Sequence, residues 1–132
     1  MFLLQTPAPA RPHTVVGRLD ILPLASKVLA NTRSIRVWFP PTFDAKKASR
    51  YPVLVMHDGQ NLFDGATSFI PGGEWRVDET ATMLIEAKLI PELVIVGVDN
   101  GGGSRGDEYL PTRFKFRSSE VGGRADLYLQ ML

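Results

Sequence analysis

Two short, continuous apolar runs constrain the fold of this 132-residue chain more than any other feature. Residues 51–56 and 93–98 have the composition of strands that are buried on both faces, as in parallel sheets covered by helices. Between them, residues 75–89 carry apolar side chains at helical spacing, which places Val77, Ala81, Leu84 and Ile85 on one face. Strand, helix and strand in this order predict a right-handed βαβ unit.

Other segments extend this unit into a larger sheet. Strand-like stretches are expected at residues 14–19 and 34–39, and Pro40-Pro41 ends the second because proline cannot continue a ladder. After Gly122-Gly123, residues 125–132 are expected to form a helix. The sequence therefore predicts an α/β fold with a mixed sheet of about four strands. A Pro- and Ala-rich flexible tail at residues 1–12 precedes one domain at residues 13–132.

Composition excludes several classes of function. Lys and Arg number 15 and Asp and Glu 14, so there is no clustered basic excess of the kind that nucleic-acid binding needs. The absence of cysteine excludes disulfides, thiol nucleophiles and Cys-ligated metals. No apolar run is long enough to cross a membrane. We expect no cofactor and a cytoplasmic location, although a cysteine-free chain also suits a secreted protein.

Two polar segments follow the predicted buried strands. In open α/β sheets, ligands bind at the carboxyl ends of the strands, where residues 57–64 and 99–109 are expected to lie. The candidate substrate-binding residues there are Asp58, Asn61, Asp99, Asn100 and Tyr109.

Several ordered blocks of the sequence resemble one enzyme family. The blocks are residues 36–41, 51–64, 75–79, 94–100, 107–111 and 122–126, and the second contains the run His57-Asp58-Gly59-Gln60-Asn61-Leu62-Phe63-Asp64. They are similar to the putative-esterase family of α/β-hydrolases, which includes feruloyl and acetyl xylan esterases, S-formylglutathione hydrolase and enterochelin-type esterases. The resemblance extends over residues 14–132. It implies the N-terminal half of an α/β-hydrolase fold and hydrolysis of a small-molecule carboxylic ester by a serine.

The resemblance also implies a role for the loop after the third strand. In α/β-hydrolases this loop donates one backbone N–H group to the oxyanion hole. By position the donor is Gln60, and Gly59 permits the tight approach of the backbone. The alternative interpretation is that residues 57–59 only turn the chain out of a strand.

The usual catalytic triad cannot be assembled from this sequence in the family order of Ser, then Asp or Glu, then His. The chain has two histidines, His13 and His57, and none follows residue 57. Gly102-Gly103-Ser104-Arg105-Gly106 fits the Gly-x-Ser-x-Gly pattern, which makes Ser104 a candidate nucleophile. However, residues 99–102 intervene between the preceding strand and Gly103-Ser104, and residues 107–111 are a poor helix start with Pro111 so near. A flexible glycine loop is the alternative.

Charged residues near this edge allow other interpretations. The acidic residues are Asp58, Asp64, Asp78, Glu79, Asp99, Asp107 and Glu108. Carboxylates of this kind bind divalent cations, but no regular ligand spacing is present. We therefore predict solvated loop charge or ion pairs with Arg76, Arg105 and Arg113, and no metal site. Residues 113–117 interleave basic and aromatic side chains, and we expect a short edge strand or loop there.

The predicted sheet leaves residues 53–57 on an open edge, which favours association with another strand. We therefore expect a homo-oligomer that forms through this edge. Such a dimer brings two copies of the loop with His57 together, with His57 as a general base and Asp58 or Asp99 as its orienting acid. The alternatives are a non-catalytic, ligand-binding or oligomerising half-domain and a second chain that supplies the missing half of the fold.

Overall fold

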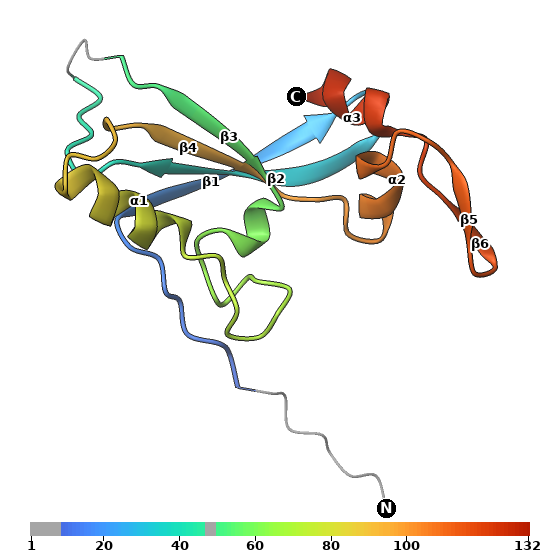
Figure 1. The fold of residues 1–132 in the computed structure, drawn as a ribbon, viewed down its shortest axis with the longest axis horizontal. Coiled ribbons are helices and arrows are strands. Elements are labelled where there is room, and N and C mark those ends of the chain that lie inside the picture. The colour runs from blue at the N-terminus through green and yellow to red at the C-terminus, as the bar shows by residue number, and fades with distance from the viewer. Residues whose placement is uncertain (1–8, 47–49) are drawn as a thin grey trace, which may run out of the picture.

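A four-stranded mixed sheet forms the body of the molecule (Figure 1). The computed structural model describes residues 9–46 and 50–132. The strand order is β1-β2-β4-β3, so β1 and β3 form the two edges. The strands are β1 (Arg18–Ser26), β2 (Asn31–Phe39), β3 (Val53–His57) and β4 (Val94–Val98). This arrangement confirms the α/β class and the mixed sheet.

The predicted βαβ unit is present. β3 and β4 are parallel, with Val53 opposite Val94, and α1 (Val77–Glu86) connects them. The helix begins after Arg76, whose φ of 56° lies in the left-handed region and turns the chain into the helix. β3 begins two residues later than predicted and extends to His57, β4 begins one residue later, and α1 is shorter than predicted at both ends.

The first predicted strand was wrong in position. Residues 14–17 do not form a strand, and β1 occupies Arg18–Ser26, antiparallel to β2. Gly17 has a φ of 87°, and the Val16 N–H donates to the Asp78 carboxylate at 2.6 Å instead of to a neighbouring strand. β2 ends at Phe39, directly before Pro40, as predicted.

The predicted tail is described only in part, because residues 1–8 lie outside the described residues. Residues 9–12 are exposed coil. The Arg11 guanidinium donates to the carbonyl oxygen of Ser68 at 2.8 Å. This contact connects the start of the described chain to the loop after β3.

The segment after β4 contains more structure than predicted. A second helix, α2 (Arg105–Tyr109), forms where a poor helix start was expected. A two-stranded hairpin follows, with β5 (Phe114–Phe116) and β6 (Ser119–Val121), so the expected short strand near residue 115 is confirmed. The predicted last helix is confirmed as α3 (Ala125–Met131). Figure 1 shows α2, α3 and this hairpin grouped at one end of the sheet, and α1 towards the other.

The core lies between α1 and one face of the sheet. Its buried residues are Trp38, Leu62, Phe63, Ala81 and Ile95. Leu62 and Phe63 enter this core directly after β3, and they anchor the polar loop that precedes them. The position of this loop is therefore fixed by apolar packing.

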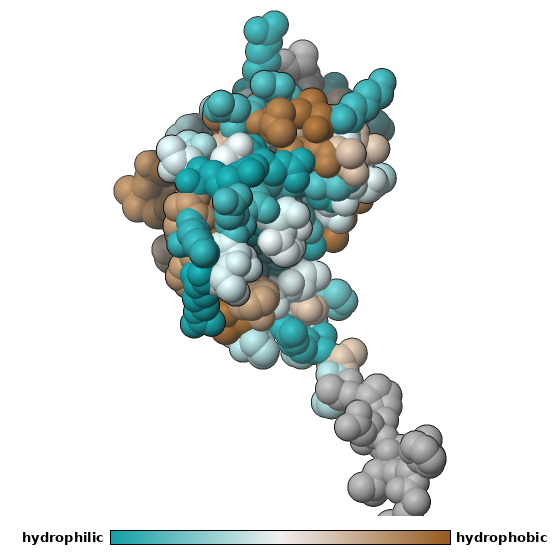
Figure 2. Space-filling model, turned by 90° about the vertical axis from the view of Figure 1, so that its right-hand side faces the viewer, coloured by the Kyte–Doolittle hydropathy of each residue, from teal (hydrophilic) through white to brown (hydrophobic). Residues whose placement is uncertain are grey.

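Several parts of the surface expose apolar side chains. The β3 edge exposes Val53, Leu54 and Val55, and β1 exposes Ile21 and Leu22. The C-terminal segment exposes Leu127, Leu129 and Leu132. Figure 2 shows hydrophobic side chains gathered at the top of the molecule, where α3 lies in Figure 1. No helix in the described part of the chain is long and apolar enough to cross a membrane.

Candidate functional site

A cavity of about 510 Å³ lies where the loops after β3 and β4 meet. Polar residues from both loops line it, together with the apolar segment before α1. The lining includes Asp58, Gln60, Asn61, Trp75, Asn100 and Arg105. Asp58, Gln60, Asn61 and Asn100 follow the carboxyl ends of two parallel strands, as the sequence predicted.

A tight turn at Gly59–Asn61 forms the base of the cavity. Asp58, with a φ of 56°, starts the turn, and the N–H groups of Asn61 and Leu62 donate its hydrogen bonds. The first N–H groups of a helical turn have no partner within it, so those of Gly59 and Gln60 are not used by the turn.

Gly59 is required by close packing. A Cβ atom at this position would lie 2.7 Å from the carbonyl carbon of Gly97 and 2.7 Å from Asp99 Oδ1. Real Cβ atoms do not approach backbone so closely, so only glycine fits without displacement of the turn. Gly59 therefore lets the turn pack closely against β4, whereas its role in an oxyanion hole stays a prediction.

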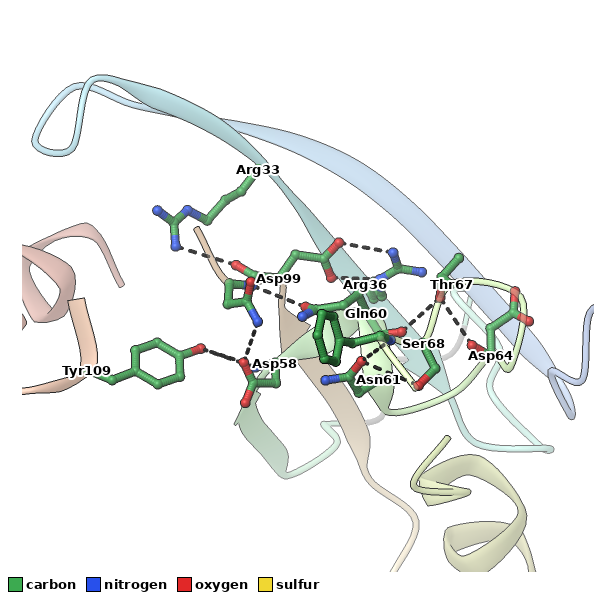
Figure 3. A network of polar contacts seen from close by, with 12 residues as sticks. Arg33, Arg36, Asp58, Gln60, Asn61, Asp64, Thr67, Ser68, Asp99 and Tyr109 are labelled. Atoms are coloured by element: carbon green, nitrogen blue, oxygen red, sulfur yellow. Dashed lines mark hydrogen bonds and ion pairs between the residues drawn. The ribbon is translucent and has the colours of Figure 1, made fainter. Parts of the chain in front are cut away.

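Asp58 is the centre of a polar network (Figure 3). Its buried carboxylate accepts hydrogen bonds from Arg105 Nε and Nη2, each at 2.8 Å, and from Asn100 Nδ2 at 2.7 Å. The Tyr109 hydroxyl lies 3.3 Å from the same carboxylate. The Arg105 guanidinium, with help from Asn100 and Tyr109, outweighs burial and lowers the pKa of Asp58. Asp58 therefore holds the two loops together as an anion.

The side chains of Gln60 and Asn61 stabilise the walls of the cavity. Gln60 Oε1 accepts from the Asn100 N–H at 3.2 Å, and Asn61 Oδ1 accepts from the Phe69 N–H at 2.8 Å. The second bond shapes the loop that brings Phe69 and Trp75 to the cavity. Phe69, Ile70 and Trp75 were missing from the predicted site, because nothing local marks this loop as part of it.

The acidic residues near the cavity are mostly paired with cations. Asp99 accepts from Arg36 at 2.7 Å and 3.0 Å, and Glu108 accepts from Arg33 at 2.9 Å and 3.0 Å. The prediction of ion pairs is confirmed, but the arginines of β2 were not among the predicted partners. Within the described residues, no group of three or more His, Asp or Glu side chains is placed to hold a metal.

Two further acidic residues, Asp64 and Asp78, bind the N-terminal segment through hydrogen bonds. Asp64 accepts from His13 Nδ1 at 2.7 Å and from the Thr14 N–H at 3.3 Å. Asp78 is fully buried, and one of its oxygens has no partner in the described structure. Burial, reinforced by the neighbouring Glu79, raises the pKa of Asp78 to about 7.

His57 lies apart from the cavity in an aromatic cluster. Its Nδ1 atom is 2.8 Å from the Tyr128 hydroxyl, and its ring contacts those of Tyr109 and Tyr128. Burial raises the pKa values of both tyrosines, so both hydroxyls stay protonated at neutral pH. The cluster joins the end of β3 to α2 and α3.

The comparison with family models now adds to this geometry. The model described as "Putative esterase" matches residues 26–132, which is most of the chain. The chain belongs to the putative esterase family. The resemblance predicted from the sequence blocks is therefore confirmed, and the segment before residue 26, with its contacts to Asp64 and Asp78, lies outside the matched region.

Solved structures support the fold of this esterase family member. An IroE-like serine hydrolase from Shewanella oneidensis has 23% identity and a TM-score of 0.67, and the match covers 86% of this chain and 34% of that one. BES protein from Bacillus cereus has 17% identity and a TM-score of 0.64, with 95% and 46% covered. The enterobactin esterase FES from Shigella flexneri has 18% identity and a TM-score of 0.58, with 99% and 29% covered.

These structural matches establish the fold of the chain and show how much of each solved structure it corresponds to. The chain spans less than half of the length of each of these three structures. A search of curated proteins gives no match.

Ser104 does not have the setting of an esterase nucleophile. In α/β-hydrolases the serine occupies a strained turn directly between a strand and a helix. α2 does follow Ser104 directly, but β4 ends at Val98, and Ser104 has ordinary right-handed angles of φ −86° and ψ −1°. In the described structure no hydrogen bond joins Ser104 to His57, whose Nδ1 faces Tyr128. The two candidate catalytic residues are therefore not brought together within one chain.

Proposed function

We propose that this chain supplies the oxyanion-hole and substrate-binding part of a carboxylic-ester hydrolase. The observation that carries the proposal is the turn at Gly59–Asn61, whose first N–H groups have no partner within the turn and whose residue Gln60 lines a cavity of about 510 Å³. Membership of the putative esterase family supports the type of reaction. The small-molecule ester needs no cofactor in this proposal.

In the proposed mechanism the Gln60 N–H donates to the carbonyl oxygen of the ester as that oxygen becomes negative. A donor held in place before the reaction stabilises this charge without reorganisation, and the loss of one such donor costs about 10²–10³ in rate. The bonds around Asp58, Asn61, Asp99 and Asn100 keep the turn and the cavity walls fixed. Phe69 and Trp75 provide apolar surface for the rest of the ester.

The nucleophile and its base come from a second polypeptide segment in this proposal. The separation of Ser104 from His57 and the bond between His57 and Tyr128 support this division. The same observations favour a second candidate function, a non-catalytic module that binds a ligand in the same cavity. Both functions need the cavity, but only the ester hydrolase needs a serine nucleophile. Detection of a reactive serine therefore distinguishes the hydrolase from the binding module.

A fluorophosphonate probe followed by intact-mass measurement tests the origin of the nucleophile. The 132-residue chain alone is expected to form no stoichiometric adduct. A stoichiometric adduct that disappears in Ser104→Ala would show that this chain contains its own activated serine, and it would overturn the proposed division of the site. Ser118→Ala is the matched control, because this serine lies in the β5–β6 turn.

A further inference from the structure

A short N-terminal segment lies against one wall of the cavity. This strap (residues 11–16) contacts the cavity loop (residues 64–70), which brings Phe69 into the cavity lining. The Thr14 hydroxyl of the strap accepts a hydrogen bond from the Gly65 N–H of the loop at 2.8 Å. The proposed mechanism gives the strap no part, and the strap lies outside the region that the family model matches.

The core fixes one end of the strap. The Val16 N–H donates to the Asp78 carboxylate at 2.6 Å, and the Val16 carbonyl oxygen accepts from Trp38 Nε1 at 2.9 Å. Trp38 and Asp78 are both fully buried. The strap therefore has a position that the core determines, and its contacts with the cavity loop pass that position on to the cavity wall.

Asp64 joins the strap to the cavity loop. Its buried carboxylate accepts from the Thr14 N–H of the strap at 3.3 Å and from the Ala66 N–H of the loop at 2.9 Å. His13 Nδ1 lies 2.7 Å from the same carboxylate. Burial opposes ionisation of Asp64, but the hydrogen bonds from these three neighbours outweigh burial and lower its pKa. Hydrogen bonds to an ionised acceptor are about twice as strong as neutral ones, so Asp64 is the main link between the two segments.

The cavity loop continues from Asp64 to the residues of the turn. The Thr67 hydroxyl donates to the Gln60 carbonyl oxygen at 2.9 Å (Figure 3). The Phe69 N–H donates to Asn61 Oδ1 at 2.8 Å. Asp64 itself is outside the described lining of the cavity. An unbroken series of hydrogen bonds therefore connects Asp64 with the cavity, although Asp64 does not face the cavity.

We propose that Asp64 is a positioning residue that, through the strap and the cavity loop, keeps Phe69 and the turn residue Gln60 in place for the ester. The effect on binding rests on the proposed function, whereas the effect on the loop rests on the contacts alone. A binding site needs a supporting layer of hydrogen bonds, because small displacements of its groups weaken binding. Asp64 supplies that support from outside the cavity.

Amide hydrogen exchange measured by NMR tests the effect on the loop without a ligand. The Phe69 N–H is the informative probe, because its acceptor is Asn61 and it changes only if the loop moves. We expect it to exchange at least about fivefold faster in Asp64→Ala, while the amides of β4 exchange as in the natural chain. Asp64→Asn keeps an oxygen that accepts from the two N–H groups, so it is expected to restore slow exchange.

Thr14→Val tests the same link from the strap and leaves Asp64 intact. It removes the hydroxyl that accepts from Gly65 at an exposed position, so the fold is expected to persist. Phe69 is expected to exchange faster in Thr14→Val but not in Thr14→Ser, nor in Thr32→Val, which changes an exposed threonine of β2. Unchanged exchange of Phe69 in both Asp64→Ala and Thr14→Val, or equally faster exchange throughout β4, would overturn the proposal.

Titration with butylphosphonate tests the effect on binding. Asp64→Ala is expected to bind this tetrahedral anion at least about fivefold more weakly than the natural chain, and Asp64→Asn within about twofold. If the natural chain binds and Asp64→Ala binds equally well, the positioning role is wrong and the proposed function stands. If the natural chain does not bind, the proposed function is contradicted, and the exchange of the Phe69 N–H still decides whether Asp64 positions the loop.

Discussion

At the scale of single residues, the site depends on two positions that only certain side chains can occupy. Gly59 lets the turn after β3 lie directly against Gly97 of β4. Asp58, with its left-handed backbone and buried carboxylate, then connects this turn to Asn100 and Arg105. A non-glycine residue in the left-handed region is strained, and the hydrogen bonds of Asp58 with Asn100, Arg105 and Tyr109 offset that strain. The family resemblance pointed to Gly59, but the sequence did not show that this residue packs against Gly97, which is distant along the chain.

Gly59→Ala tests the close approach of the turn to β4. The added methyl group meets backbone atoms that have no room to move, so we expect a loss of about 1–3 kcal/mol in the free energy of unfolding. Urea unfolding followed by tryptophan fluorescence measures it. Gly103→Ala is the control, because a Cβ there meets nothing within 4 Å. Equal stability of Gly59→Ala and Gly103→Ala would contradict the packing argument.

Asp78 gives the stability of the protein a distinct dependence on pH. Its pKa is raised to about 7 by burial, whereas an unfolded chain releases this proton near pH 4. Between these values the unfolded state binds fewer protons, so this residue makes stability fall as pH rises from about 4 to about 7.

Asp78→Asn removes this proton and keeps an oxygen that accepts from the Val16 N–H. We expect the variant to gain stability relative to the natural chain across that window, by about 1.4 kcal/mol for each unit of the pKa shift. The pKa values of Asp58 and Asp64 are lowered, so their stabilisation disappears only below about pH 4, and it does so in both proteins. If the free energies of unfolding of Asp78→Asn and of the natural chain differ by the same amount at every pH from 4 to 8, the described burial of Asp78 is contradicted.

At the scale of elements, the sequence predicted those whose signal is local and missed those held by distant residues. β3, α1 and β4 were predicted because continuous apolar runs and helical spacing identify them directly. α2 was missed because Gly106 and Pro111 argue against a helix. It forms nevertheless because Glu108 is paired with Arg33, 75 residues earlier in the chain. The cavity wall at Phe69 and Trp75 was missed for the same reason, since Asn61 positions it through a bond to a backbone N–H.

Glu108→Ala tests whether this ion pair holds α2 against β2. The side chains of Arg33 and Glu108 are only 3% and 1% exposed, and removal of one partner leaves a buried charge. We expect a loss of about 3–5 kcal/mol in the free energy of unfolding. The double variant Arg33→Met, Glu108→Leu is expected to recover most of that loss.

The control for this variant is Glu120→Ala, which breaks the exposed pair with Arg113. It is expected to change stability by less than about 1 kcal/mol. Chemical denaturation gives all three values. A Glu108→Ala variant as stable as Glu120→Ala would mean that the buried pair does not secure α2.

At the scale of the whole molecule, the fold brings a binding cavity and an open sheet edge to neighbouring parts of β3. The strand ends at His57, and the turn at Gly59–Asn61 begins two residues later. In our proposal the polar residues after the strand bind the ester. The candidate pair His57 and Ser104 was suggested by residue type and pattern, and sequence alone did not show that Tyr128 engages the histidine.

The most direct test of the account is a titration of the cavity with butylphosphonate, an anion that imitates the tetrahedral intermediate of ester hydrolysis. Trp75 is 57% exposed at the cavity, whereas Trp38 is fully buried in the core, so a change in tryptophan fluorescence reports on Trp75. We expect a saturable change that is absent in Trp75→Phe. Gly59→Ala is expected to weaken binding about tenfold or more, because it displaces the Gln60 N–H, and Gln60→Ala, which keeps that N–H, is expected to bind within about threefold of the natural chain. No saturable change, or equal binding by Gly59→Ala, would contradict the central claim that this turn is the oxyanion site.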